Sequence, residues 1–444
     1  MDMFVVQGGR SLSGSLRVSG SKNASLPVMA ATLAVDGAVN LANVPDLADV
    51  RTLARLLEQL GMHVHRGEDG GLQLQTVSTS TSVADYELVR TMRASVCVLG
   101  PLLARRGWAC VSLPGGCQIG HRPIDLHLKG LAALGAELWT ERGYVFGKCS
   151  RLRGARISLS GDQGSTVTGT CNVLSAAVLA EGMTVIEGAA CEPEVVDLAN
   201  FLNACGAQIS GQGTPELTIE GVDALHGCEY EVIPDRIEAA TLLTAAAMTC
   251  GALSLSGVVA EHLSAVLQVL REVGASIELE DDTINLTGPE VIQPTEITAV
   301  PYPGFPTDTQ AQLMALLSLA KGRSVVKDCV FPDRFLHVSE LCRLGARIQR
   351  DGNTALIDGV PYLSGANVMA SDLRASAALV LAALAARDES TIRRIYHLDR
   401  GYEQLERKLN QLGASVVRTV DTPQNIPLPL QPPTLVTPGI KRPA

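Results

Sequence analysis

Apolar and polar positions recur along the chain in a unit that repeats six times. In each unit, polar or charged residues precede a helix that is apolar almost all round, and a β-rich run, an amphipathic helix and another strand follow. Glycine suits the end of the amphipathic helix because a helix C-cap often needs left-handed backbone. The pattern predicts an α/β fold of six units, divided into two lobes of three, with one boundary near Glu231. The amphipathic helices are expected to end, about every 70 residues, at Gly61-Met62, Gly135-Ala136, Gly206-Ala207, Gly274-Ala275, Gly345-Ala346 and Gly413-Ala414.

The first helix of each unit is predicted to be buried, because apolar residues cover all its faces. Helix N-termini carry partial positive charge and free N–H groups, which suit anions. Charged residues also flank buried helices without binding anything, but their recurrence at equivalent positions favours a shared anion-binding cleft. The helix starts are Lys22-Asn23-Ala24-Ser25, Arg93-Ala94-Ser95, Gly169-Thr170-Cys171-Asn172, Asp235-Arg236-Ile237-Glu238, Thr307-Asp308-Thr309-Gln310 and Asp372-Leu373-Arg374-Ala375-Ser376.

Composition supports a well-buried globular protein with more than one core. The chain has 444 residues, of which 46% are hydrophobic and 18% charged. Its start lacks the pattern of a signal peptide, and its longest apolar stretch, Ala375–Ala386, is too short to cross a bilayer. A cytoplasmic protein is therefore expected, as a monomer or weak homo-oligomer. The net charge of −10 disfavours nucleic acid but still allows small anionic substrates. The Pro-rich residues 421–444 are expected to form a disordered tail.

Cysteine and histidine spacing argues against a metal site. Eleven cysteines without a Cys-x-x-Cys pair are typical of reduced thiols, most of them buried. His63 and His65 share one face of a predicted strand but lack a third ligand nearby, so surface positions are expected. Neither a dinucleotide fingerprint nor a Walker motif is present.

Two positions stand out chemically. Cys117 lies in a segment with three glycines beside His121 and Arg122, which predicts an exposed loop thiol with a stabilised thiolate. Asp308 has two interpretations of similar weight: an N-cap, or a general base for an alcohol substrate. Arg374 and Arg400 can each make two parallel bonds to a carboxylate or phosphate.

Several motifs together resemble the UDP-N-acetylglucosamine 1-carboxyvinyltransferase (enolpyruvyl transferase) family, from the N-terminus to about Arg418. The resemblance implies an inside-out α/β barrel in two lobes, each built from three βαβαββ units, with a cleft that closes on substrate. One lobe would comprise residues 22–232 and carry the Cys117 loop; the catalytic lobe would combine residues 1–21 with 233–420. The motifs are Gly20-Ser21-Lys22-Asn23, Arg90-Thr91-Met92-Arg93-Ala94-Ser95, Gly115-Gly116-Cys117 continuing to His127, Pro234-Asp235-Arg236-Ile237-Glu238, Phe305-Pro306-Thr307-Asp308, Asp372-Leu373-Arg374-Ala375-Ser376 and Tyr396 to Tyr402.

The resemblance also implies a reaction without metal or organic cofactor, in which phosphoenolpyruvate and UDP-N-acetylglucosamine are the substrates. Cys117 would protonate the methylene carbon, form a covalent adduct with phosphoenolpyruvate and react with fosfomycin, while Asp308 would help deprotonate the sugar 3′-hydroxyl. Asp372 and Arg374 would organise the closed site. Residues implied to bind phosphoenolpyruvate are Lys22, Asn23, Arg122, Arg374 and Arg400, with Lys22 and Arg400 also counted as catalytic. Residues implied to bind the UDP-sugar are Arg93, Arg122, Pro123, Asp125, Leu126, His127, Asp308 and Phe331.

The sequence departs from that family at several positions. Ala48 replaces a common basic residue, Cys97 a large aromatic, and Pro332 a common acidic residue, while 161–165 lacks a lysine often found near the diphosphate. These departures concern diphosphate binding and closure. An enolpyruvyl transferase with another acceptor, such as shikimate 3-phosphate or a nucleotide, and a catalytically silent UDP-sugar-binding paralogue remain alternatives.

Overall fold

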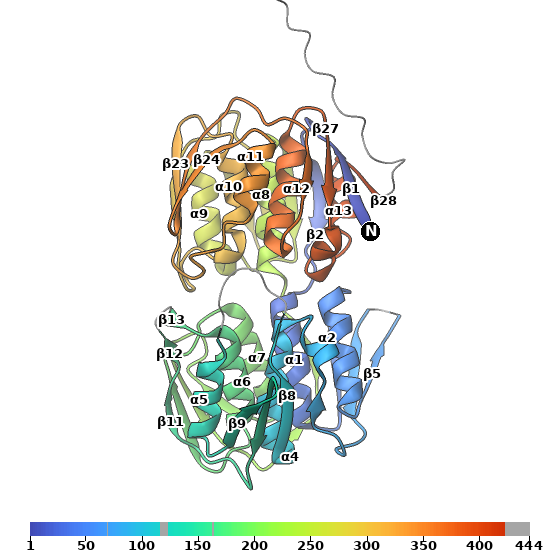
Figure 1. Ribbon diagram of the computed structural model, residues 1–444, viewed down its shortest axis with the longest axis vertical. Helices are drawn as coiled ribbons and strands as arrows, with labels where there is room; N and C mark the ends of the chain where they lie inside the picture. The colour runs from blue at the N-terminus through green and yellow to red at the C-terminus, as the bar shows by residue number, and fades with distance from the viewer. Residues whose placement is uncertain (69, 116–122, 162–163, 422–444) are drawn as a thin grey trace, which may run out of the picture.

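The chain forms two lobes stacked along the long axis of the molecule (Figure 1). The computed structural model describes residues 1–68, 70–115, 123–161 and 164–421. Each lobe has its own hydrophobic core. The core of the lower lobe in Figure 1 joins buried residues between Ala24 and Val232. The core of the upper lobe joins Phe4–Val18 to buried residues from Ala239 to Val416. Cys117, Arg122 and the tail beyond 421 lie outside the described residues.

Among the described residues, six four-stranded sheets surround the two cores, one for each repeated unit. In every sheet the first two strands in the order below are parallel and the other neighbours are antiparallel. One lobe holds β18 (Glu229–Glu231)-β4 (Ala38–Ala42)-β6 (Leu72–Thr76)-β5 (Met62–Arg66), β7 (Val83–Ala84)-β8 (Trp108–Ser112)-β10 (Tyr144–Lys148)-β9 (Glu137–Glu141), and β11 (Arg156–Ser158)-β14 (Met183–Glu187)-β16 (Glu216–Glu220)-β15 (Gln208–Ser210). The other holds β2 (Ser13–Arg17)-β19 (Ala252–Ser256)-β21 (Thr283–Thr287)-β20 (Ser276–Glu280), β22 (Glu296–Ala299)-β23 (Arg323–Asp328)-β25 (Thr354–Asp358)-β24 (Arg347–Asp351), and β26 (Asn367–Met369)-β27 (Glu389–Arg393)-β1 (Asp2–Gln7)-β28 (Ser415–Val420).

The chain begins in one lobe, crosses to the other and returns. Strand β1 lies between β27 and β28, with Phe4 paired to Ile392 on one side and Arg418 on the other. The sequence could not establish this long-range pairing. The outward and returning segments meet where Gly20 and Pro234 form an antiparallel bridge. Two short strand pairs complete the described sheets: β3 (Val35–Asp36) with β17 (Leu225–His226), and β12 (Ser160–Gly161) with β13 (Gly164–Ser165).

Six buried helical segments fill the two lobes, as their apolar surfaces predicted. In α12, every residue from Arg374 to Leu384 is buried, and in α8 every residue from Ile237 to Met248 is buried. Each buried Leu or Met side chain contributes roughly 1.5–3 kcal/mol relative to exposure. The segments are α1 (Lys22–Ala31), the 3₁₀ helix η2 (Arg93–Val98) followed by α4 (Leu99–Arg106), α6 (Val167–Ala177), α8 (Arg236–Met248), η4 (Thr307–Thr309) followed by α10 (Gln310–Leu317), and α12 (Leu373–Ala385).

The six amphipathic helices end as the glycine pattern predicted. Each is followed by its expected glycine in left-handed backbone, with φ between 84° at Gly61 and 104° at Gly274. Only glycine adopts this conformation at little cost. These helices are α2 (Ala48–Gln59), α5 (Asp125–Ala133), α7 (Pro193–Ala204), α9 (Ser264–Glu272), α11 (His337–Arg343) and α13 (Leu405–Gln411). The remaining described helical segments are η1 (Thr32–Ala34), α3 (Tyr86–Val89), η3 (Ala260–Leu263) and η5 (Ile395–Arg400).

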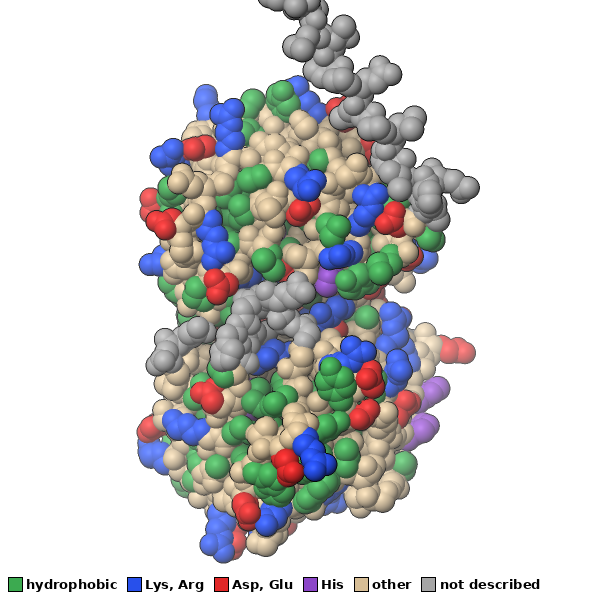
Figure 2. Space-filling model, viewed as in Figure 1, with side chains coloured by type: hydrophobic (Ala, Val, Ile, Leu, Met, Phe, Trp, Pro, Cys, Tyr) green, Lys and Arg blue, Asp and Glu red, His purple; other side chains and the backbone are tan. Residues whose placement is uncertain are grey.

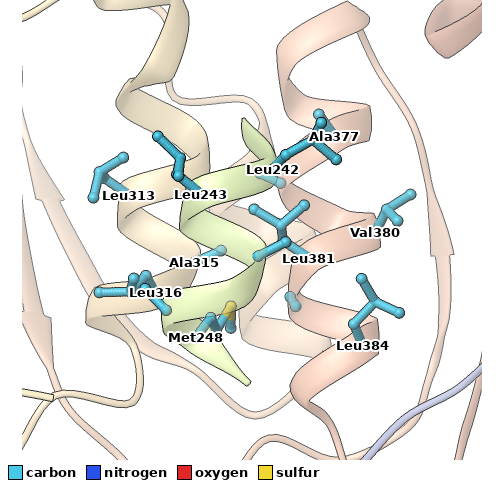
Figure 3. Close-up of a cluster of buried hydrophobic side chains, with 14 of the residues drawn as sticks. Leu242, Leu243, Met248, Leu313, Ala315, Leu316, Ala377, Val380, Leu381 and Leu384 are labelled. Carbon is cyan, nitrogen blue, oxygen red and sulfur yellow. The ribbon is translucent and has the colours of Figure 1, made fainter. Parts of the chain in front are cut away.

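The surface confirms one expectation and corrects another. His63 and His65 on β5 are exposed, and histidine side chains project from the lower lobe on that side (Figure 2). Cysteines are less uniformly buried than expected: Cys250 and Cys342 are exposed. No helix within the described residues is long and apolar enough to cross a membrane. In the core of the upper lobe, apolar side chains of α8, α10 and α12 point toward one another (Figure 3).

Candidate active site at the boundary between the lobes

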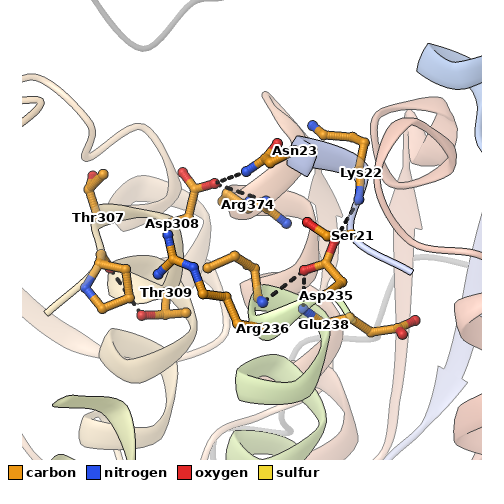
Figure 4. A network of polar contacts seen from close by, with 12 residues as sticks. Ser21, Lys22, Asn23, Asp235, Arg236, Glu238, Thr307, Asp308, Thr309 and Arg374 are labelled. Atoms are coloured by element: carbon orange, nitrogen blue, oxygen red, sulfur yellow. Dashed lines mark hydrogen bonds and ion pairs between the residues drawn. The ribbon is translucent and has the colours of Figure 1, made fainter. Parts of the chain in front are cut away.

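Asp308 lies at the start of a buried helical segment, where two arginines bind it; Figure 4 shows its contacts with Arg374 and Asn23. Its Oδ1 accepts a bond of 2.7 Å from Arg334, and its Oδ2 accepts one of 2.9 Å from Arg374. From the other lobe, the side-chain amide of Asn23 approaches Oδ2 at 3.5 Å. Both arginines are almost fully buried, with side-chain exposures of 8% and 3%, whereas Asp308 retains 25%. The carboxylate is therefore the accessible part of a buried ion cluster.

The capping interpretation of Asp308 is wrong. Helix η4 begins after Pro306, and neither η4 nor α10 has a side-chain cap. By contrast, Asp235 accepts bonds from the backbone N–H groups of Ile237 and Glu238 and so caps α8. The carboxylate of Asp308 is free of a capping role because both oxygens face the arginines.

The arginines control the ionisation of Asp308. Burial by itself would raise the pKa of this carboxyl group, but the charges of Arg374 and Arg334 outweigh burial and hold the pKa well below its usual value. Conversely, Asp308 helps to raise the pKa of Arg374 against the effect of burial. At neutral pH the cluster therefore contains an ionised carboxylate and two guanidinium ions.

A hydrogen-bonded network holds the guanidinium group of Arg374 in place. Its Nη1 donates to the Tyr402 hydroxyl at 3.2 Å, and that hydroxyl lies 2.9 Å from the Thr241 hydroxyl. The Gln312 amide donates to both hydroxyl groups and to the backbone carbonyl of Asp308. Asp372 caps α12 by accepting the N–H groups of Arg374 and Ala375 at 3.0 Å. Arg374 is thus held at both its backbone and its side chain, which fixes the direction of its charge.

A second cationic group crosses the lobe boundary. The buried carboxylate of Asp49, in the first turn of α2, accepts bonds of 2.9 and 3.4 Å from Arg400 on the opposite lobe. Lys22 lies 3.8 Å from the same carboxylate. Burial lowers the pKa of Lys22; Asp49 opposes this shift, and the nearby Arg374 charge adds to it. Two of the predicted phosphoenolpyruvate ligands thus share one buried counter-ion.

The residues implied to bind the UDP-sugar are more dispersed. His127 is buried in α5, and its ring nitrogens lie 3.2 Å from Thr168 Oγ1 and 3.0 Å from Asn172 Nδ2. Asp125 and Pro123 are exposed, and Leu126 is half-buried. Arg93 begins η2, and its guanidinium approaches the Pro123 carbonyl at 3.5 Å. Phe331 lies on the opposite lobe, with the Arg334 guanidinium 5.7 Å from its ring centre.

Three functional candidates escaped the sequence argument: Arg334, Asp49 and Asp328. Asp328 is fully buried and accepts bonds from the Thr307 hydroxyl and the backbone N–H groups of Val330 and Phe331. It therefore ties the segment before Asp308 to the turn that leads to Arg334. All three lie outside the buried-helix starts and the motifs identified in the sequence. A single charged residue within a loop or an amphipathic helix has no local sequence pattern that distinguishes it from a surface residue.

Two predicted residues, Cys117 and Arg122, lie outside the described residues. Within the described ones, no group of three His, Cys, Asp or Glu side chains is arranged to hold a metal ion. Three residues that differ from the family pattern have ordinary structural surroundings. Ala48 is the first residue of α2, and the Pro332 carbonyl accepts a hydrogen bond from Arg350. Cys97 is buried, which raises its pKa to about 12.

This combination of fold and site matches one class of enzymes. The profile of EPSP synthase (3-phosphoshikimate 1-carboxyvinyltransferase) matches residues 6–409. The crystal structure of the enolpyruvyl transferase NikO from Streptomyces tendae superposes with a TM-score of 0.86 at 26% identity, covering 94% of this chain and 99% of that one. An EPSP synthase from Acinetobacter baumannii shares the fold, with a TM-score of 0.74 at 17% identity over 95% of this chain and 100% of that one.

Curated relatives narrow the class. Proteins named UDP-N-acetylglucosamine 1-carboxyvinyltransferase from Methylacidiphilum infernorum and Lawsonia intracellularis are 52% and 51% identical to this chain. Each match covers 94% of this chain, with 99% and 100% of the relatives. The chain therefore belongs to the UDP-N-acetylglucosamine 1-carboxyvinyltransferase family, within the EPSP synthase-like enolpyruvyl transferases.

Proposed function

We propose that this chain transfers the enolpyruvyl group of phosphoenolpyruvate to the 3′-hydroxyl of UDP-N-acetylglucosamine, the first committed step of peptidoglycan synthesis. The sugar oxygen attacks the central carbon of phosphoenolpyruvate while the methylene carbon gains a proton, which gives a tetrahedral intermediate. Loss of that methyl proton and breakage of the carbon–oxygen bond to phosphate restore the double bond and release inorganic phosphate.

One observation carries the proposal: a chain of this family gathers four cationic side chains from two lobes at one boundary. Arg334 and Arg374 bind the carboxylate of Asp308. Arg400 and Lys22 lie against the carboxylate of Asp49. Phosphoenolpyruvate carries a carboxylate and a phosphate, and arginine side chains can bind each through two parallel bonds. Local clustering of cations provides this charge although the whole chain has a net charge of −10.

Asp308 is the proposed general base, with a pKa that depends on the substrate. In the free protein its arginine partners keep it ionised and weakly basic. A substrate anion that takes over part of the Arg374 or Arg334 charge weakens this stabilisation and raises the proton affinity of Asp308. Its basicity thus increases when phosphoenolpyruvate occupies the site, and the ionised carboxylate is already unprotonated when the sugar hydroxyl arrives.

Cys117 is the proposed proton donor to the methylene carbon, and Arg122 a further ligand of phosphoenolpyruvate. Support comes from the sequence, in which a cysteine lies among glycines beside His121 and Arg122. The thiol form supplies the proton, and the thiolate that remains is stabilised by the neighbouring positive charge and reacts readily with electrophiles. Fosfomycin is therefore expected to alkylate the wild-type protein at Cys117 and to leave Cys117→Ser unmodified, as read by intact mass.

Phosphate release from phosphoenolpyruvate by the purified protein tests the proposal directly. The acceptors to compare are UDP-N-acetylglucosamine, UMP, shikimate 3-phosphate and none. Release that depends on UDP-N-acetylglucosamine supports the proposal. Release with another acceptor would support enolpyruvyl transfer but place the reaction outside peptidoglycan synthesis. A folded sample that binds the UDP-sugar but releases no phosphate would instead identify a silent paralogue.

A further inference from the structure

The outer surface of one sheet is unusually aromatic. Only 3% of the chain is aromatic, yet both of its tryptophans lie on the sheet β7-β8-β10-β9. Val145 and Gly147 of β10 are buried, so Tyr144 and Phe146 project from the opposite, solvent side. We define the aromatic face as Trp108, Trp139, Tyr144 and Phe146.

Three of the four rings form a contiguous row. Trp139 and Phe146 stack with centroids 5.3 Å apart, and Tyr144 lies 6.4 Å from Phe146. Trp108 and Trp139 are 39% and 38% exposed. Hydrophobic side chains gather on the lower lobe over the elements that Figure 1 labels β8 and β9 (Figure 2). Exposed apolar surface of this kind marks an interaction site more often than isolated exposed residues do.

The internal repeats provide a control for this observation. In the aromatic sheet, the middle row across strands two to four is Cys110–Phe146–Trp139. If the fold required Phe, Tyr or Trp at these positions, the other five sheets would have them, but none has one in its middle row. Those rows are Asn40–Gln73–His65, Val185–Thr218–Ser210, Ser254–Asn285–Glu278, Val325–Leu356–Gln349 and Thr391–Val5–Val417.

The chain itself contains a segment suited to this face. Residues 427–433 read Pro-Leu-Pro-Leu-Gln-Pro-Pro, beyond the end of the family match at 409. Pro-rich segments favour the polyproline II conformation, and aromatic surfaces bind them at low entropic cost. Lys441 and Arg442 further along the tail complement Glu137 and Glu141, the exposed acids of edge strand β9.

We propose that the aromatic face binds the Pro-rich tail of another copy of this chain. The described chain leaves the upper lobe after β28, whereas the aromatic face belongs to the lower lobe (Figure 1). The six residues from Asp421 to Pro427 span only about 19 Å in polyproline II geometry. A neighbouring copy supplies the segment without this constraint, so the assignment is to a contact between copies.

The two tryptophans make the test direct, because both report on this face. A synthetic peptide of residues 421–444 is titrated into the chain that lacks residues 422–444. Saturable change in tryptophan emission is expected, and a peptide with Pro427, Pro429, Pro432 and Pro433 changed to Ala should give none. Calorimetry should show at least tenfold weaker binding to Trp139→Ala, since exposed aromatic anchors dominate such interfaces. The matched control, Leu356→Ala in the middle row of another sheet, should bind normally.

Dilution of the full-length protein distinguishes the source of the tail. For a contact between copies, emission should shift toward that of the shortened chain on dilution, and the mass from light scattering should fall. Concentration-independent emission that differs from that of the shortened chain would place the tail on its own face and overturn the assignment. So would self-association of the shortened chain that depends on Trp139, which would identify a second aromatic face as the occupant. Absence of peptide binding together with identical emission of both chains would remove the proposal entirely. Phosphate release per chain should be unchanged by the truncation, so this test is independent of the proposed reaction.

Discussion

The buried helices of the two lobes begin differently, although the lobes repeat the same unit. In the lower lobe, the hydroxyl groups of Ser21 and Thr166 cap α1 and α6, and η2 has no side-chain cap. In the upper lobe, the carboxylates of Asp235 and Asp372 cap α8 and α12. A neutral cap leaves the partial positive charge of a helix start available to a ligand, whereas a carboxylate offsets it.

This difference indicates a division of labour. The lower lobe caps α1 and α6 with its own hydroxyl groups, although Asp235 of the upper lobe also accepts the Lys22 N–H at the start of α1. With Lys22 and Arg93 at two of its helix starts, this lobe is suited to the diphosphate and phosphate of the substrates. The upper lobe neutralises two helix starts with aspartates and offers arginine side chains as anion ligands instead. Asp308 is the exception within the upper lobe, because its carboxylate pairs with Arg334 and Arg374 rather than with backbone N–H groups.

The largest effect is expected when Asp308 is neutralised. Asp308→Asn should lower kcat by about 10²–10⁴-fold through loss of the general base, while calorimetric affinity for UDP-N-acetylglucosamine changes much less. The matched variant is Asp235→Asn, because asparagine caps helices about as well as aspartate; it should retain most of its activity. Equal losses of turnover and of UDP-sugar binding in Asp308→Asn would reduce Asp308 to a structural residue.

Removal of a guanidinium partner should have a smaller effect on turnover and a clear effect on stability. Arg374→Met leaves Asp308 with a single close arginine and removes one of the donors to the Tyr402 hydroxyl. Breaking a buried ion pair typically lowers the free energy of unfolding by about 3–5 kcal/mol. Because the Asp308 carboxylate is partly exposed, the loss in Arg374→Met should lie at or below the lower end of this range. Urea unfolding measures the loss, and the KM for phosphoenolpyruvate should rise at least tenfold. An unchanged KM would exclude Arg374 from substrate binding.

Sequence periodicity predicted the repeated architecture because each unit carries its own local signals, such as the left-handed Gly61 and Gly274. It also located Lys22, Asp308 and Arg374 at helix starts. It could not establish the pairing of β1 with β27 and β28, which depends on contacts between residues about 380 to 420 apart in sequence. Asp49 escaped notice because its importance comes from Arg400, which reaches it from the other lobe.

The pH dependence of phosphoenolpyruvate binding should reveal Lys22 on the lower lobe. Burial lowers the pKa of Lys22, so its charge is lost at a lower pH than that of an exposed lysine. The KM for phosphoenolpyruvate should therefore rise with pH on the alkaline side, by up to about tenfold per pH unit once the lysine is neutral. Lys22→Arg, which stays charged, should lack this limb. The same alkaline rise in both proteins would assign it to another group.

The smallest predicted effect tests the comparison of helix starts most directly. Thr166→Asp gives α6 the kind of cap found in the upper lobe, and Thr166→Asn provides a neutral cap of similar shape. Both should match or slightly exceed the wild-type free energy of unfolding, since aspartate and asparagine cap at least as well as threonine. Only Thr166→Asp should raise the KM for UDP-N-acetylglucosamine, by several-fold, because one helix-end charge interaction contributes about 0.3–1 kcal/mol. An equal KM in the two variants would mean that the absence of a carboxylate cap on α6 does not serve anion binding.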